Sequence, residues 1–129
     1  MDAKKLKHHQ LTELILKGFY EVYNELGRGF LESVYENALA LVLKGYGLKV
    51  ECQKPITVYF RGQIVGDFRA DIVVNDSVIV ELKAVKAIDP AHVSQLLNYL
   101  KATDIEVGLL LNFGDKPEFK RLVYQNTRK

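Results

Sequence analysis

The sequence contains little cysteine, little proline and no long apolar run. A single cysteine, Cys52, excludes an internal disulfide framework and a zinc site built from cysteines alone. The longest uncharged apolar stretch, residues 107–113, is too short to span a membrane as a helix. No apolar signal core follows the basic start. We therefore expect a cytoplasmic protein that has no membrane partner.

The composition is that of a folded domain. Apolar residues make up 48% and charged residues 26% of 129 residues, which predicts one domain, residues 1–129, with a core at about 10–115. The net charge of +2 is uneven, because basic tails at residues 1–7 and 116–129 flank an acidic body. Basic tails are typical of proteins that bind a polyanion. A role in solubility alone explains them equally well.

Apolar spacing predicts two helices, then strands. Helical stripes fall at residues 11–26 (Leu11, Leu14, Ile15, Phe19, Val22, Leu26) and 31–42 (Leu31, Val34, Tyr35, Ala38, Leu41, Val42). Strands are predicted at 56–60, 64–74, 78–85 and 105–112. A helix should begin at Asp89-Pro90, and residues 117–124 are predicted to form a short terminal helix. This order predicts an α/β fold, with a mixed four-stranded sheet flanked by helices.

Charged residues lie on strands that should be central. Alternation places Phe68, Ala70, Ile72 and Val74 on one face of their strand and Asp71 on the other. Asp71 can then meet Glu81 of the next strand, with Lys83 beside them. Two converging carboxylates are compensated by a divalent cation, and hard oxygen ligands favour Mg²⁺ or Mn²⁺. Salt bridges alone, from Lys83 to Glu81 and from Arg69 to Asp71, are the structural alternative.

Two further elements supply polar side chains. On the helix after Asp89, Gln95 and Tyr99 share one face, and His92 lies close to it. This face should be distinct from the apolar stripe of that helix and can point at the carboxylates. Glu32 lies in the first turn of the second helix. There it either joins the acidic cluster or only stabilises the positive end of that helix.

Together these residues resemble a known family. Residues 29–35 (GFLESVY) match the Gly-x-x-Glu-x-x-Tyr signature of the GxxExxY proteins, of the PD-(D/E)XK nuclease-like superfamily. Residues 69–71 (RAD), 81–85 (ELKAV), 95–100 (QLLNYL) and 108–114 (GLLLNFG) are similar to the rest of its pattern. Ala70 stands where the superfamily motif has proline. The resemblance covers residues 10–115 and implies a restriction-endonuclease-like α-β-β-β-α-β core with an extra N-terminal helix.

The resemblance also implies roles for individual residues. It implies that Asp71, Glu81 and the backbone carbonyl of Leu82 bind a divalent metal ion, with Glu32 joining directly or through water. Lys83 would orient or activate the attacking water. The catalytic set it implies comprises Glu32, Asp71, Glu81, Lys83 and Gln95, and the substrate-binding set Tyr99, Tyr35, His92 and Arg69.

The expected function is that of an Mg²⁺- or Mn²⁺-dependent nuclease that hydrolyses phosphodiester bonds, with DNA the expected substrate. A non-catalytic nucleic-acid-binding module and a protein-interaction subunit remain open alternatives. So do a homodimer or larger complex, and inactivity of the isolated domain, because fold resemblance alone does not establish turnover.

Overall fold

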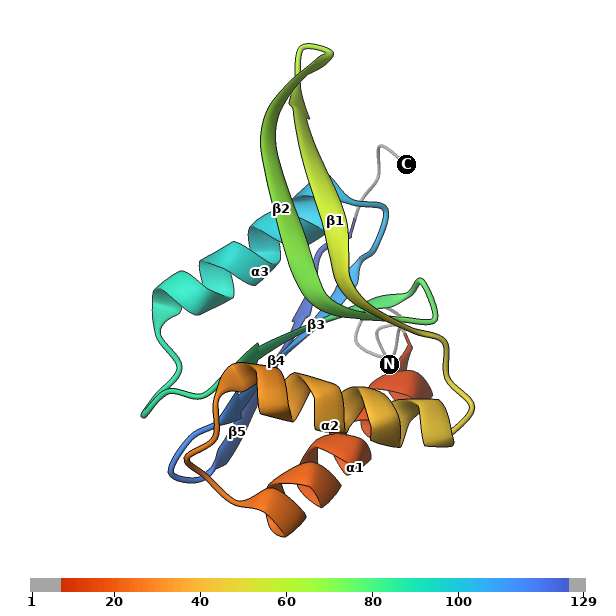
Figure 1. Cartoon of the computed structure of the whole chain (residues 1–129). Coiled ribbons are helices and arrows are strands. Elements are labelled where there is room, and N and C mark those ends of the chain that lie inside the picture. Colours follow the sequence, from red (N-terminus) through yellow and green to blue (C-terminus); the bar gives the residue numbers. More distant parts are fainter. Residues whose placement is uncertain (1–7, 126–129) are drawn as a thin grey trace.

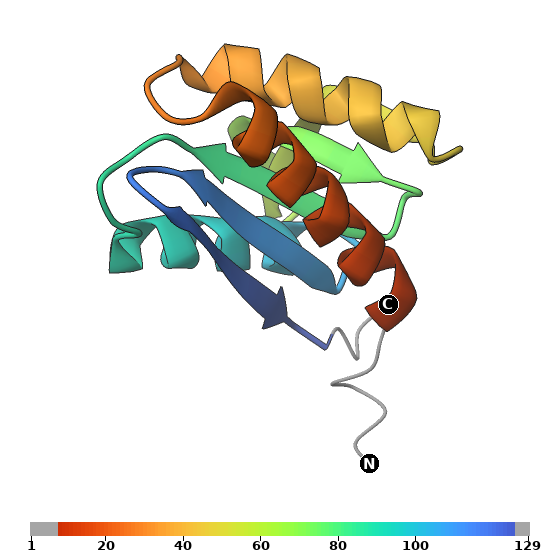
Figure 2. The same cartoon turned by 90° about the horizontal axis from the view of Figure 1, so that it is seen from below.

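The computed structural model describes residues 8–125. The basic segment 1–7 and the last four residues of the C-terminal tail lie outside this range. Within it, helices cover both faces of a five-stranded sheet, with α1 and α2 on one face and α3 on the other (Figures 1 and 2). This arrangement confirms the predicted α/β fold with a mixed sheet. No helix among the described residues combines the length and apolar character needed to cross a bilayer.

The sheet has the strand order β1-β2-β3-β4-β5. Its strands are β1 (Val50–Phe60), β2 (Gln63–Val74), β3 (Val78–Lys83), β4 (Val107–Phe113) and β5 (Pro117–Val123). The first three are antiparallel neighbours, whereas β3 and β4 run parallel and are connected through α3 (Pro90–Ala102). The predicted N-cap of α3 is confirmed, because the Asp89 side chain accepts a hydrogen bond from the Ala91 amide.

The last strand corrects the predicted terminal helix. Residues 117–123 pair antiparallel with β4, from Pro117 opposite Phe113 to Val123 opposite Val107. β4 is fully buried and needs a hydrogen-bonding neighbour on each side. β3 supplies one neighbour and β5 supplies the other, so the sheet has five strands instead of the four expected.

α1 (His9–Leu26) and α2 (Glu32–Gly45) pack on one face of the sheet. The stripe on α1 is buried at its centre, at Ile15, Phe19 and Val22, while Leu26 at its end is exposed. The helices approach closely at Gly18, where an added Cβ would lie 3.0 Å from the Leu43 side chain.

The stripe predicted for α2 is rotated in the structure. Tyr35, Leu39 and Leu43, spaced four residues apart, are fully buried. Leu31 and Leu41, which belong to the predicted stripe, are 76% and 74% exposed. Leu31 precedes the first helical residue, so it lies outside the periodic pattern of the helix.

β1 and β2 form a long hairpin that projects from the rest of the molecule (Figure 1). At its base, Ile72 and Val74 pack in the cluster under α1 and α2, whereas Ala70 packs in the cluster under α3. The predicted shared face of Phe68, Ala70, Ile72 and Val74 is therefore wrong. The change of face lies between Ala70 and Ile72, at the level of Gln53 on the partner strand, whose φ of 54° is left-handed.

Candidate active site

The carboxylate of Asp71 lies where β2 separates from β3. The two strands pair only from Val74–Val78 to Ile72–Val80, after which β3 continues beside β4 alone. Asp71 Oδ2 accepts a hydrogen bond of 2.8 Å from the Leu82 amide. The carboxylate thus takes the place of the backbone acceptor that β2 would supply if it continued beside β3. A residue's N–H and C=O point to the same edge of a strand, so the Leu82 carbonyl faces this gap too.

Glu81 is the charged group that the fold buries most deeply at this point. Its side chain is 5% exposed, and its Oε1 atom has no hydrogen-bond partner. The pKa of Glu81 is raised to about 10. Burial is the largest cause, a side-chain hydrogen bond with Asp71 and the charge of Asp71 act in the same direction, and a backbone hydrogen bond at Asp71 and the charge of Lys83 oppose them. The metal-free site therefore holds one proton on the pair at neutral pH.

Lys83 ends β3 two residues after Glu81, so both side chains leave the same face of the strand. Lys83 is partly buried, and its charge favours the ionised form of Glu81. The structure thus brings Asp71, Glu81 and Lys83 together at one end of a buried strand. The predicted convergence of these three residues matches the geometry.

Gln95 and Tyr99 reach the site from α3. The Gln95 amide donates to the Tyr99 hydroxyl at 3.1 Å. Burial raises the pKa of Tyr99, and the carboxylates of Glu81 and Asp71 act in the same direction, so its hydroxyl lies within electrostatic range of both acids. Tyr99 is only 6% exposed and packs with Leu96, so it also belongs to the apolar core, contrary to the expectation of a separate polar face.

A second carboxylate approaches Asp71 from α2, and it is Glu36 instead of Glu32. Gln53 Nε2 donates to Glu36 Oε1 at 2.7 Å and lies 3.5 Å from Asp71 Oδ1. Burial raises the pKa of Glu36, the Gln53 hydrogen bond lowers it, and the charges of Asp71 and Glu32 raise it. Gln53 lies between the pairs Cys52–Ile72 and Lys54–Ala70 of the hairpin, at the level of Asp71. The register of this hairpin is therefore the feature from which Gln53 could have been identified as a site residue.

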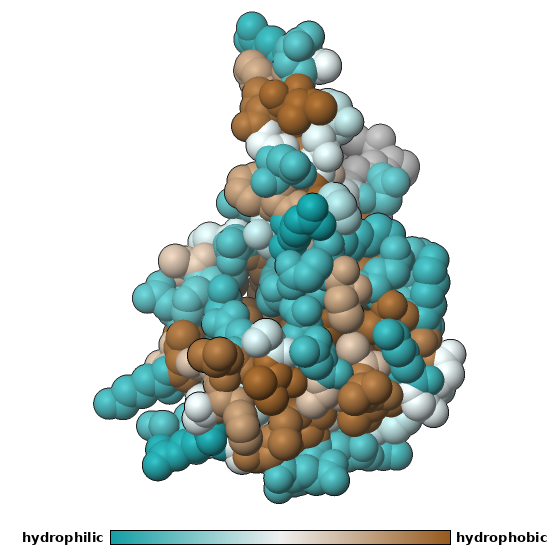
Figure 3. Space-filling view, viewed as in Figure 1, coloured by the Kyte–Doolittle hydropathy of each residue, from teal (hydrophilic) through white to brown (hydrophobic). Residues whose placement is uncertain are grey.

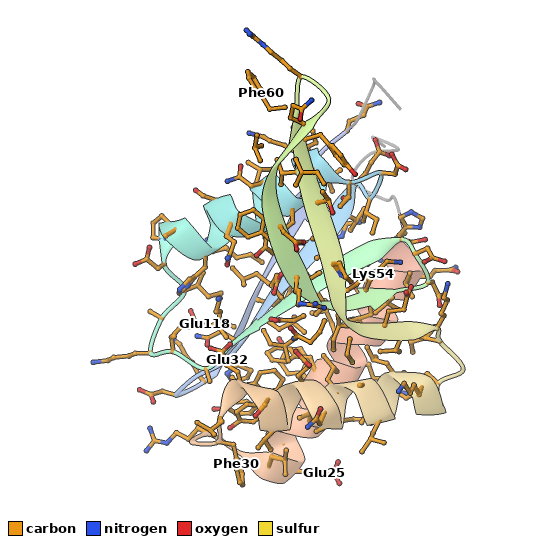
Figure 4. The ribbon with its side chains drawn as sticks, turned by 45° about the horizontal axis from the view of Figure 1, so that its top comes forward. Glu25, Phe30, Glu32, Lys54, Phe60 and Glu118 are labelled. Carbon is orange, nitrogen blue, oxygen red and sulfur yellow. The ribbon has the colours of Figure 1, made fainter. Side chains whose placement is uncertain are left out.

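Glu32 lies at the margin of this cluster. It is exposed at the first position of α2, on the side of the molecule where Glu118 also lies (Figure 4). Its charge acts on Glu36, one helical turn further along. Glu32 thus lies within electrostatic range of Glu36, which Gln53 links to Asp71.

Three other predicted residues have structural partners. Tyr35 is fully buried, and its hydroxyl donates to the Gly27 carbonyl at 2.6 Å and accepts from the Phe30 amide, which leaves its ring no surface for substrate. His92 Nδ1 accepts from the Asp89 amide at 3.1 Å, as part of the cap of α3.

Arg69 Nη1 donates to the Gln53 carbonyl at 3.0 Å, and no ion pair joins it to Asp71 among the described residues, as the salt-bridge alternative would require. Arg69 is exposed on β2, two residues before Asp71. It therefore supports the backbone of Gln53.

The donor set fits a hard divalent cation. Among residues 8–125 no three His, Cys, Asp or Glu side chains form a ready cage for a metal ion. Mg²⁺ does not require one, since it binds through one or two carboxylates and keeps several waters. Asp71, Glu81 and the Leu82 carbonyl supply oxygen ligands only, and the unpartnered Oε1 of Glu81 is a buried acceptor that a cation would satisfy.

Comparisons with known proteins agree with the fold. The family model of the PD-(D/E)XK nuclease superfamily matches residues 9–122. A solved structure titled "Crystal structure of SSO0001" is similar, with a TM-score of 0.56 and 19% sequence identity. The similarity covers 96% of this chain but 63% of that one, and at this identity it shows a shared fold alone. A search of curated proteins found no match. The family match spans nearly all of the described residues, and the chain belongs to the PD-(D/E)XK nuclease superfamily.

Proposed function

We propose that this protein is a metal-dependent nuclease that hydrolyses phosphodiester bonds in DNA with Mg²⁺ or Mn²⁺. The observation that carries the proposal is the pairing of Asp71 with a buried Glu81 whose Oε1 atom has no partner. Burying two ionised carboxylates side by side destabilises the fold unless a cation compensates their charge or one of them holds a proton. Nucleic-acid binding alone does not require such a pair.

The position of each residue suggests its role in the proposed reaction. Asp71, Glu81 and the Leu82 carbonyl would hold the cation. A bound divalent cation would lower the pKa of a water and offset charge on the phosphate. Lys83, on the same face as Glu81, would orient the attacking water and stabilise charge that develops on the phosphoryl oxygens.

Support for these residues would come from α2 and α3. Gln95 donates a hydrogen bond to the Tyr99 hydroxyl and would orient it within electrostatic range of the carboxylates. Glu32 would contribute through water at the margin. The sequence of residues 29–35 supports a finer placement among the GxxExxY proteins, which is part of the proposal.

A cleavage assay tests the proposal. Linear and circular DNA, single- and double-stranded, and RNA are incubated with the protein and Mg²⁺ or Mn²⁺. Glu81→Gln and Lys83→Met remove the proposed functions with little change in size. Glu25→Gln on α1 and Lys120→Met on β5 are matched controls, since both residues are exposed away from the site.

We expect metal-dependent cleavage that falls by about 100-fold or more in both site variants and is unchanged in both controls. The linear and circular substrates then separate exonuclease from endonuclease. Cleavage that survives both site variants contradicts the proposed site. Salt-sensitive DNA binding without cleavage on any substrate favours the non-catalytic binding module.

A further inference from the structure

A groove runs between the projecting hairpin and α3. Its volume is about 810 Å³, within the range of sites that hold small organic ligands. The residues that line it and carry the argument are Tyr59, Phe68, Gln95, Asn98, Tyr99 and Lys101. The groove begins at the candidate active site, because Gln95 and Tyr99 belong to both.

The hairpin exposes three aromatic side chains to solvent. Tyr59 is 64%, Phe60 58% and Phe68 46% exposed. The rings of Phe68 and Tyr99 pack in a tilted arrangement, 5.9 Å apart centre to centre, and both line the groove. Figure 3 shows a hydrophobic band just below the tip of the hairpin. Exposed aromatic surface of this extent on a projecting element is typical of a binding surface.

The charge of the groove selects the class of ligand. Its lining residues include one cation, Lys101, and no carboxylate. At the tip of the hairpin, the Arg61 guanidinium lies 5.0 Å from the centre of the Phe60 ring. Aromatic faces beside cations and neutral amides match unpaired nucleotides, since bases stack on the rings and phosphates meet the cations.

We propose that the groove between the β1–β2 hairpin and α3 binds single-stranded nucleic acid and guides it to the carboxylates. This inference rests on the proposed nuclease function and specifies the substrate as an unpaired strand. Duplex bases are stacked on one another and cannot present their faces to Tyr59 and Phe68. A second copy of the chain is the competing occupant. The amides of Gln95 and Asn98 on the groove wall favour a ligand with hydrogen-bonding edges.

Binding is measured without divalent metal, so that no cleavage interferes. Fluorescence anisotropy follows a labelled 15-nucleotide dT strand, the matching rU strand and a 15-base-pair DNA duplex. Tyr59→Ala and Phe68→Ala, singly and together, remove the stacking surfaces. Phe119→Ala on β5 is the control, because Phe119 is 42% exposed on the strand at the opposite edge of the sheet. Phe68→Leu removes the ring and keeps an apolar side chain in case the alanine variant does not fold.

We expect the unmodified protein to bind a single strand more tightly than the duplex. The double variant should lose about ten-fold or more of that affinity, the equivalent of about one base stack, and Phe119→Ala should lose less than two-fold. The dT and rU strands show whether DNA or RNA is preferred. Equal binding of strand and duplex, or strand affinity that Phe68→Leu and the double variant leave unchanged, overturns the inference.

Two further measurements separate the alternatives. A dimer mass in solution that Tyr59→Ala and Phe68→Ala abolish assigns the groove to a second copy and overturns the inference. Cleavage by the unmodified protein, compared with Asp71→Asn, tests the nuclease function independently. Groove-dependent strand binding without any cleavage leaves the binding site standing and rejects the catalytic proposal.

Discussion

Glu81 dominates the electrostatics of the site because its environment opposes its ionised form. The folded protein keeps Glu81 protonated up to about pH 10, whereas the unfolded chain releases this proton near pH 4.5. Between these values the unfolded state binds fewer protons than the folded state. The free energy of unfolding of the metal-free protein must therefore fall as the pH rises through this window.

Glu81→Gln should abolish this pH dependence. The amide resembles the protonated acid in shape and cannot ionise, so the metal-free variant should be more stable than the unmodified protein at pH 8. We expect a gain of about 2 kcal/mol or more, since each pKa unit corresponds to about 1.4 kcal/mol. Urea denaturation at pH 5, 6.5 and 8 measures it, with Glu25→Gln as the exposed control. A variant with the same slope against pH as the unmodified protein would show that Glu81 does not carry the proton.

Gln53 combines an unusual backbone with a bridging side chain. Its φ of 54° is left-handed, a conformation that is unfavourable for most side chains, and its amide donates to Glu36. A strained residue next to a cluster of carboxylates indicates that its position matters for the site.

Replacing Gln53 separates these two roles. Gln53→Gly fits the backbone and removes the amide, so we expect stability that is unchanged or raised by about 1 kcal/mol, with weaker metal-dependent cleavage. Gln53→Ala removes the same amide but keeps the strained backbone, so it should be less stable than the glycine variant. Urea denaturation and a magnesium titration of activity measure both effects. Full activity in Gln53→Gly would mean that the bridge to Glu36 and Asp71 is dispensable.

At the scale of elements, the end of β3 is held in place by β4. The Asn112 side chain forms two hydrogen bonds with the backbone of Val85, accepting from its N–H at 3.0 Å and donating to its C=O at 2.9 Å. Val85 lies two residues after Lys83. This clamp therefore fixes the chain immediately after the candidate lysine.

The backbone of Val85 also restricts residue 114 to glycine. A Cβ at this position would lie only 2.2 Å from the Val85 carbonyl oxygen, a backbone atom that cannot rotate away. Gly114→Ala should destabilise the protein by about 1–3 kcal/mol and reduce cleavage by displacing the segment after Lys83.

Gly45→Ala is the matched control for Gly114→Ala. No heavy atom lies within 4 Å of a Cβ added at Gly45, the last residue of α2. We expect it to be neutral or slightly stabilising in thermal unfolding. If both glycine variants behave alike, the close contact at Val85 is not what restricts position 114.

Features that depend on adjacent residues were predicted more accurately than features that depend on contacts between distant elements. The helix cap at Asp89 and the alternation of faces along β3, with Val80 and Leu82 in one core cluster and Ile79 in the other, depend on adjacent residues, and both match the structure. β5 was missed because pairing with β4, and not its own seven residues, makes it a strand. The bridge from Glu36 through Gln53 depends on where α2 lies against β1, which no local pattern encodes.

At the scale of the whole molecule, proton and metal binding are linked to stability through one site. The fold closes around Asp71 and Glu81 in a state that holds a proton on the pair. A cation needs both carboxylates ionised, so its binding must release that proton. Magnesium should therefore restore the stability that the metal-free protein loses as the pH rises.

This linkage predicts a pH-dependent thermal shift. Because Glu81 must ionise, the apparent affinity for Mg²⁺ should rise by up to about ten-fold per pH unit below pH 10. At a fixed magnesium concentration, the rise in melting temperature should be several degrees larger at pH 8.5 than at pH 6.5. Glu81→Gln should show little shift at either pH. Asp76→Asn is the control, since Asp76 is exposed and pairs with Lys49 at 2.9 Å. A shift that is independent of pH, or that persists in Glu81→Gln, would place the cation elsewhere, because only a site that includes Glu81 must displace its proton.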